Sequence, residues 1–200
     1  HFTVAIQEDA EDYAGKTALA AVNFIMPLAT ILATIGFMIG TGGSALVGKM
    51  RGEGDQQRAN RTFSLLVYTA TILGVILALC GYFLTPFLAA TLGAQGQMLH
   101  DSIIYGRMIM ITLPFFVLQY VFQSFFVAAG KPQIGFFVIL AAGLSNIILD
   151  ALLVGAIGWG LEGAALATNI SQVIGGGAGL VYFMHKNTSY FQLGRCAFEP

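Results

Sequence analysis

The stretch KPQIGFFVILAAGLSNIILDALLVGAIGW (131–159) decides the fold, because after Lys131 it contains a single charged residue, Asp150. About 20 consecutive apolar residues in a helix cross a hydrocarbon core of ~30 Å. The stretch therefore predicts a transmembrane helix with one acidic residue inside it.

The composition extends this prediction to the whole chain. Of the 200 residues, 56% are hydrophobic and only 10% are charged, whereas a soluble domain has about 25% charged residues. The net charge of −1 gives no indication of a nucleic-acid partner. We expect an all-α integral membrane protein, multi-pass in the cell membrane, with about five spans near 18–48, 62–90, 102–128, 133–156 and 162–184.

The segments between these spans differ in positive charge. The first break (49–61) contains Lys49, Arg51, Arg58 and Arg61, the third contains Lys131, and the second and fourth contain no Lys or Arg. Lys and Arg are enriched in cytoplasmic loops. We therefore expect the first and third breaks and the C-terminal tail to be cytoplasmic. The N-terminal acidic cluster and the Trp159 turn then lie outside.

Small residues recur at spacings that suit close helix packing. Gly36 and Gly40 form one GxxxG pair, and Gly175 and Gly179 form another. Such pairs let helix backbones approach each other, so they indicate packing rather than chemistry. Pro27 and Pro114 fall inside spans and predict bends, which serve either gating or static packing.

The isolated carboxylate at Asp150 carries most of the functional argument. A charged side chain at the centre of a membrane helix costs roughly 2.5–3.5 kcal/mol on insertion scales. Such a group is usually paired with a cation, a proton or a partner side chain. Two interpretations follow: an ion site, or a protonated Asp that hydrogen-bonds to a neighbouring helix.

The last two spans place polar groups at matching depth. Asp150 lies nine residues before Trp159 and Thr168 nine residues after it. Residues equidistant from a hairpin turn have similar depth, because both helices rise ~1.5 Å per residue. Asn146 shares a face with Asp150, as Ala164 does with Thr168. Hard oxygen donors of this kind suit a hard cation or a proton.

Other polar residues in the spans are few. Gln119 and Gln123 share a helix face with aromatic neighbours and either hydrogen-bond between helices or line a wet cavity. The aromatic residues of the spans either line a cavity for an apolar cation or face lipid. As substrate-cavity candidates we take Asn23, Gln119, Gln123 and Gln172.

Three segments resemble the multidrug and toxic compound extrusion (MATE) transporters: YAGKTALAAVNFIMPL (13–28), GTGGSALVGKMRGEGDQQRAN (40–60) and SNIILDALLVGAIGWGLEGAALAT (145–168). The resemblance implies helices two to six of the N-terminal lobe of a two-lobe, twelve-helix transporter. On this basis 13–200 contains those helices and the start of the inter-lobe linker. Residues 1–12 do not resemble the family's first helix.

The resemblance also implies roles for individual residues. Asn146 would offer its side-chain oxygen, Asp150 its carboxylate, Ala164 its backbone carbonyl and Thr168 its hydroxyl to a sodium ion or a proton. No other metal or cofactor is implied. The family places a further Asp on its first helix, and Asp9 and Asp12 do not stand at the matching position. The missing helix and second lobe would be partners.

The implied function is cation-coupled antiport that exports drugs and organic cations, with the chain as part of the transporter. Two alternatives remain open: a lipid-linked oligosaccharide flippase of the same superfamily, and an inactive half-transporter that only associates with other membrane proteins. A flippase predicts more cations within the helices, where only Arg107 occurs. We expect no enzyme, since the spans contain no His–carboxylate cluster or nucleophile motif.

Overall fold

The computed structural model describes the backbone of residues 2–91, 93–185 and 191, and the α1 side chains of Lys16, of 20–23 and of 25 onward. Within this part of the chain, all regular structure is helical. The helices are listed in chain order: α1 (Phe2–Gly52), α2 (Gln56–Thr91), α3 (Gly96–Ala128), α4 (Pro132–Asp150), η1 (Ala151–Ala156) and α5 (Gly160–Met184).

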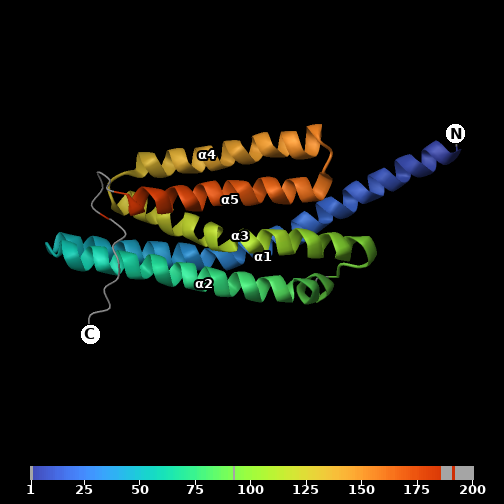
Figure 1. Ribbon diagram of the computed structural model, residues 1–200. Helices are drawn as coiled ribbons and strands as arrows, with labels where there is room; N and C mark the ends of the chain where they lie inside the picture. Colours follow the sequence, from blue (N-terminus) through green and yellow to red (C-terminus); the bar gives the residue numbers. More distant parts are fainter. Residues whose placement is uncertain (1, 92, 186–190, 192–200) are drawn as a thin grey trace.

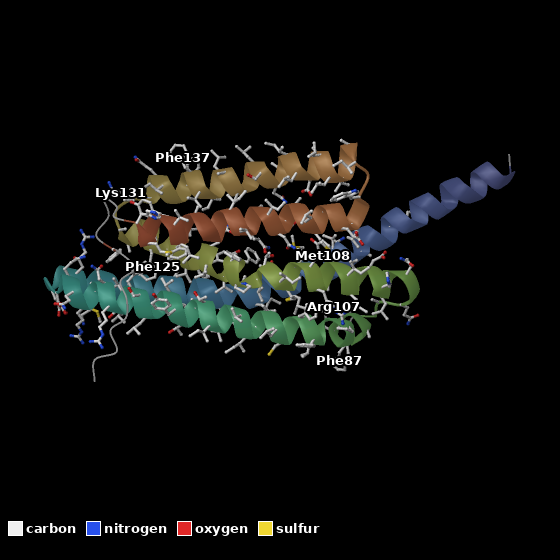
Figure 2. The ribbon with its side chains drawn as sticks, viewed as in Figure 1. Phe87, Arg107, Met108, Phe125, Lys131 and Phe137 are labelled. Atoms are coloured by element: carbon white, nitrogen blue, oxygen red, sulfur yellow. The ribbon has the colours of Figure 1, made fainter. Side chains whose placement is uncertain are left out.

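The helices form an up-and-down antiparallel bundle (Figure 1). The α1–α2 and α3–α4 turns lie at one end, and the α2–α3 and α4–α5 turns lie at the other. Figure 2 shows Lys131 at the first end, with Phe87 and Arg107 toward the second. The N-terminal part of α1 extends beyond the other helices (Figure 1). The arrangement places the basic turns at one end, as the charge pattern predicts.

Helix α3 is the centre of the bundle, since it contacts α1, α2, α4 and α5. Glycines make these contacts close. A Cβ added at Gly36 of α1 would collide with the backbone of Val117 on α3, and one at Gly40 would lie 3.0 Å from the Cα of Val121. A Cβ at Gly176 of α5 would collide with the carbonyl oxygen of Phe115. Cβ atoms at Gly175 and Gly179 would collide with the side chains of Gln119 and Phe122, so both glycine pairs identified in the sequence lie against α3.

An aromatic cluster fills the bundle near the end that carries Lys131. The rings of Phe63 and Phe125 lie 4.7 Å apart, and those of Phe63 and Phe183 5.0 Å apart. Phe122 stacks on Phe183 with 5.5 Å between ring centroids. These side chains are fully buried and come from α2, α3 and α5. The cluster joins the three helices at this end, so these phenylalanines pack the core rather than line a substrate cavity.

The connection between α4 and α5 departs from a simple helical hairpin. After Asp150 the chain forms the π-helix η1, in which Ile157 N–H donates to the Leu152 carbonyl at 2.9 Å. Gly158 and Gly160 then have φ values of 77° and 52°, a region that favours glycine. Trp159 between them is 53% exposed, as expected of an interfacial anchor.

Five helices of the described residues are long and apolar enough to cross a membrane: Ala20–Gly52, Gln56–Thr91, Gly96–Ala128, Pro132–Ala156 and Gly160–Met184. Their number agrees with the prediction, but most begin or end several residues beyond the predicted limits. Helix α1 begins at Phe2, and the polar break predicted at 49–61 is mostly helical. Polar residues continue a helix beyond the apolar span, so hydropathy alone places the ends too far inward. Residues 186–190 and 192–200 of the C-terminal tail lie outside the described residues.

Candidate functional site

Asp150 lies at the junction of α4 and η1, where the hydrogen-bond pattern of the helix changes. Its Oδ1 atom is buried and has no hydrogen-bond partner among the described residues. Single π-helical turns are rare and frequently occur at functional sites. A buried carboxylate oxygen without a donor is energetically costly, so this atom is available for a cation or a proton.

Tyr105 of α3 joins the site from the centre of the bundle. Its side chain lies next to Thr168 of α5 and close enough to Asp150 for an electrostatic interaction. Tyr105 is 1% exposed. Side chains of α3, α4 and α5 therefore come together here. Asp150 and Thr168 both lie near Tyr105, which agrees with the similar depth predicted for them from the hairpin. Sequence reasoning missed Tyr105, because its position relative to the hairpin depends on how α3 packs.

The other two predicted cation ligands lie on the same helices. Asn146 is half-buried one helical turn before Asp150 on α4, and Ala164 is half-buried one turn before Thr168 on α5. Helices α4 and α5 pack against each other along their length. The four residues therefore come from two antiparallel neighbours, and Tyr105 adds a hydroxyl from α3.

A second polar group, formed by Thr112, Asn169 and Gln172, lies at the α3–α5 interface one to two helical turns from Tyr105 and Thr168. Thr112 Oγ1 lies 2.8 Å from Asn169 Oδ1 and 2.7 Å from Gln172 Oε1, while Asn169 Nδ2 donates to the Met108 carbonyl at 2.9 Å. A hydroxyl has one hydrogen and can donate to only one of the two amides. The Thr112 hydroxyl of α3 therefore donates to one of these two amide oxygens of α5 at a time. These hydrogen bonds connect α5 to α3.

The four substrate-cavity candidates have different surroundings. Asn23 on α1 and Gln123 on α3 are exposed. Gln119 is half-buried with its amide against Gly175 of α5, and Gln172 is 5% exposed and engaged with Thr112. Gln119 thus lies at the contact between α3 and α5, and Gln172 accepts a hydrogen bond across it. The cavity itself stays a prediction.

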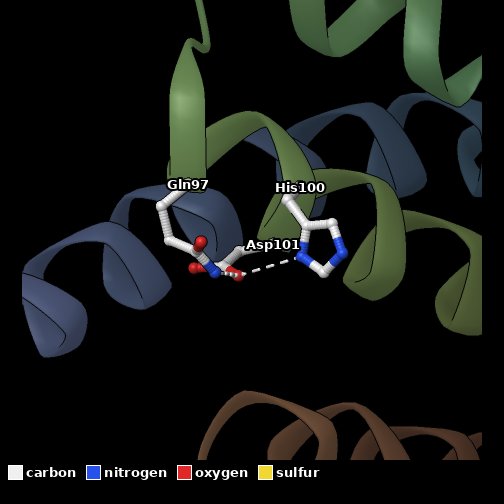
Figure 3. A network of polar contacts seen from close by, with 3 residues as sticks. All are labelled: Gln97, His100 and Asp101. Carbon is white, nitrogen blue, oxygen red and sulfur yellow. Dashed lines mark hydrogen bonds and ion pairs between the residues drawn. The ribbon is translucent and has the colours of Figure 1, made fainter.

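A separate polar network lies in the first turns of α3 (Figure 3). Gln97 Nε2 donates to Asp101 Oδ1 at 2.9 Å, and His100 Nδ1 lies 3.7 Å from the same carboxylate oxygen. All three residues belong to one helix and lie at the end of the bundle opposite Lys131. The network is local to this end of α3 and does not include Asp150.

Comparisons with known proteins agree with this architecture. A family model described as MatE matches residues 10–152. The multidrug export protein MepA of Staphylococcus saprophyticus is 31% identical over 169 residues, which are 84% of this chain and 38% of that protein.

Solved structures share the fold. An inward-facing multidrug resistance MATE family transporter superposes with a TM-score of 0.86 at 23% identity, covering 93% of this chain and 42% of that one. An outward-facing one gives 0.81 at 22% identity, covering 98% and 45%. The chain is thus similar in fold to transporter structures in both states.

The bundle and its sequence relatives define a multi-pass cell-membrane protein of a transporter class. The chain belongs to the MatE family, the multidrug and toxic compound extrusion transporters. This confirms the resemblance seen in the sequence. The chain spans about 38% of the length of the curated relative it matches, in agreement with the predicted partial chain.

Proposed function

We propose that this chain forms part of the first lobe of a cation-coupled antiporter that exports drugs and organic cations. The coupling ion, a sodium ion or a proton, binds at Asp150 with Asn146, Ala164 and Thr168. The observation that carries this proposal is the buried Asp150 Oδ1 atom without a hydrogen-bond donor, next to a Tyr105–Thr168 pair.

The chemistry of the donors supports a hard cation or a proton. Carboxylate, amide, hydroxyl and carbonyl oxygens favour such ions over soft transition metals. A bound ion would neutralise Asp150 and let the Thr168 and Tyr105 hydroxyls orient toward it. Because Tyr105 belongs to α3, this change acts directly on the helix that contacts all the others.

Coupling needs a difference in affinity between two states. A ligand shifts a conformational equilibrium only as far as it binds one state better than the other. The π-helix η1 next to Asp150 is a local element whose hydrogen bonds can rearrange. In this account, ion entry from outside favours one arrangement of the α3–α4–α5 contact and drug binding favours the other, as the two halves of the transporter alternate access.

The substrate class rests on the relatives and the surface of the lobe. MepA is named a multidrug export protein. Aromatic side chains such as Phe37 and Tyr120, whose rings lie 6.3 Å apart, suit amphipathic organic cations through cation–π contacts. Asn23 and Gln123, both exposed, are polar contacts for such substrates in the assembled cavity.

The test uses the complete gene product that contains this chain. In proteoliposomes, ethidium efflux should depend on an imposed sodium or proton gradient. Asn146→Ala should raise the ion concentration needed for half-maximal efflux, because it removes one ligand while the carboxylate stays. Ser145→Ala, the adjacent change on α4, serves as the control and should leave that concentration unchanged. Efflux that ignores both gradients would contradict ion coupling.

A further inference from the structure

Arg107 is a cation within a membrane span that the proposed transport mechanism does not use. Its Cζ lies 5.1 Å from the centroid of the Tyr82 ring on α2, and its Nε atom is buried without a hydrogen-bond partner. Among the residues that the structure describes, Arg107 has no ion pair. A cation–π contact attracts the guanidinium but leaves its charge and most of its donors unmatched.

An apolar groove between α2 and α3 begins beside this pair. It has a volume of about 290 Å³ and includes Val75, Ala78 and Tyr82 of α2 and Met110, Ile111 and Pro114 of α3 in its lining. Met110 and Ile111 follow Arg107 by one helical turn, so they share its face. The lining of the groove is apolar, and Tyr82, which lines it, connects it to Arg107, whose guanidinium lies against the Tyr82 ring. We call the part of the groove beside this pair its cationic end.

The cationic end lies nearer the α2–α3 turn than the apolar part does. α3 has 33 residues, a length of about 50 Å, so roughly 10 Å extends beyond each side of a ~30 Å hydrocarbon core. Arg107 is eleven residues from the start of α3. It therefore lies ~6 Å below the hydrocarbon boundary, a depth from which an arginine side chain reaches the headgroups.

We propose that this groove binds one anionic phospholipid of the leaflet at the α2–α3 turn. The acyl chain lies along Ala78, Met110 and Pro114, and the phosphate accepts hydrogen bonds from Arg107. Charge complementarity favours this occupant, since a planar guanidinium with free donors matches a phosphate. The positions of Arg107 and the groove also favour a phospholipid, because Arg107 lies toward the headgroups and the apolar groove lies toward the bilayer centre.

The test measures lipid retention by the 200-residue chain in phosphatidylcholine nanodiscs that contain phosphatidylglycerol as a minor component. Spin-labelled phosphatidylglycerol should show a motionally restricted fraction larger than that of spin-labelled phosphatidylcholine. Arg107→Gln should reduce this preference about fivefold, as expected for one cation near an anionic lipid. Arg107→Lys should retain part of it. Arg58→Gln, which removes an exposed arginine at the other end of the bundle, is the control and should change nothing.

A second variant tests the groove. Leu79 lines it and is 56% exposed, so Leu79→Trp fills the groove from its open side without displacing the core. This variant should lose the restricted phosphatidylglycerol while its helical circular dichroism is retained.

Equal restriction of both lipids in the original chain would overturn the proposal, as would unchanged restriction in Leu79→Trp. Displacement of the label by free glycerol phosphate as well as by the lipid would assign the site to a soluble anion instead. Loss of the restricted lipid when the chain is joined to the rest of its gene product would assign the groove to another protein segment.

Discussion

The side chains of Tyr105 of α3 and Thr168 of α5 lie next to each other in the buried part of the bundle, close to Asp150. This contact connects the acidic residue on α4 to the helix that all the others touch. A change in what Asp150 holds therefore acts on a hydroxyl pair between α3 and α5. The proposed ion site thus lies within the packing of α3, α4 and α5 and not on the outer surface of the bundle.

Removing the Tyr105 hydroxyl tests this connection. Tyr105→Phe keeps the ring but removes the hydroxyl next to Thr168, and should reduce stability by about 1 kcal/mol. In the complete transporter it should also shift the ion dependence of efflux, because Thr168 loses its partner. Tyr82→Phe, a tyrosine of α2, is the matched control. Unaltered ion dependence in Tyr105→Phe, with only the stability loss, would make the pair purely structural.

Glycine packing between α5 and α3 gives a sharply matched comparison. A Cβ at Gly176 would collide with the Phe115 carbonyl oxygen, whereas one at Gly177 meets nothing within 4 Å. Gly176→Ala should therefore destabilise the protein by about 1–3 kcal/mol. Gly177→Ala should be neutral or stabilise it by up to ~1 kcal/mol through helix propensity. Thermal unfolding in detergent measures both, and equal melting temperatures would contradict the close contact.

The Thr112 network predicts a non-additive pair. Thr112→Val leaves the Asn169 and Gln172 amides without their hydroxyl partner, at a cost of about 1–3 kcal/mol for a buried polar group. Gln172→Leu in that background should recover part of the loss, because it removes one unmatched amide. The two single variants and the double variant, compared by thermal unfolding, form a double-mutant cycle. Simple additivity would show that the amides are not coupled through Thr112.

The orientation in the membrane follows from the basic turns. In a background without Cys80 and Cys196, a cysteine at Gln56 should be protected from an impermeant thiol reagent added outside cells. One at Gln95, in the α2–α3 turn, should be labelled. Both positions are exposed, so burial does not decide the result. Labelling at position 56 without labelling at position 95 would show that the chain has the opposite orientation in the membrane.

Much of the fold could be predicted from the sequence, because the apolar composition and the length of a segment identify it as a membrane span. The five spans follow from apolar runs, and the spacing of Gly36, Gly40, Gly175 and Gly179 indicates close helix packing. The π-helix η1 could not be predicted, since neither composition nor periodicity distinguishes it from an α-helix. The helix ends were also misplaced, because polar residues outside the bilayer remain helical.

The candidate site was predicted in part. Asp150 is conspicuous as an isolated charge, and Thr168 follows from counting residues on either side of Trp159. Tyr105 could not be found this way, because it belongs to α3, and helix rotation is set by packing rather than by spacing. For the same reason the sequence does not show that Gln172, a substrate-cavity candidate, contacts Thr112 of α3.

The central claim is that the Asp150 carboxylate holds the coupling ion, and Asp150→Asn tests it most directly in the complete transporter. This change keeps the shape of the side chain and removes its charge. Glu162→Gln, an exposed carboxylate on α5, is the control. Ethidium efflux driven by a sodium or proton gradient should disappear in Asp150→Asn, with expression and membrane insertion largely retained. Thr168→Val should weaken it less and Thr168→Ser should preserve it. Normal gradient-driven efflux in Asp150→Asn would show that the carboxylate is a structural hydrogen-bonding group and would contradict the ion site.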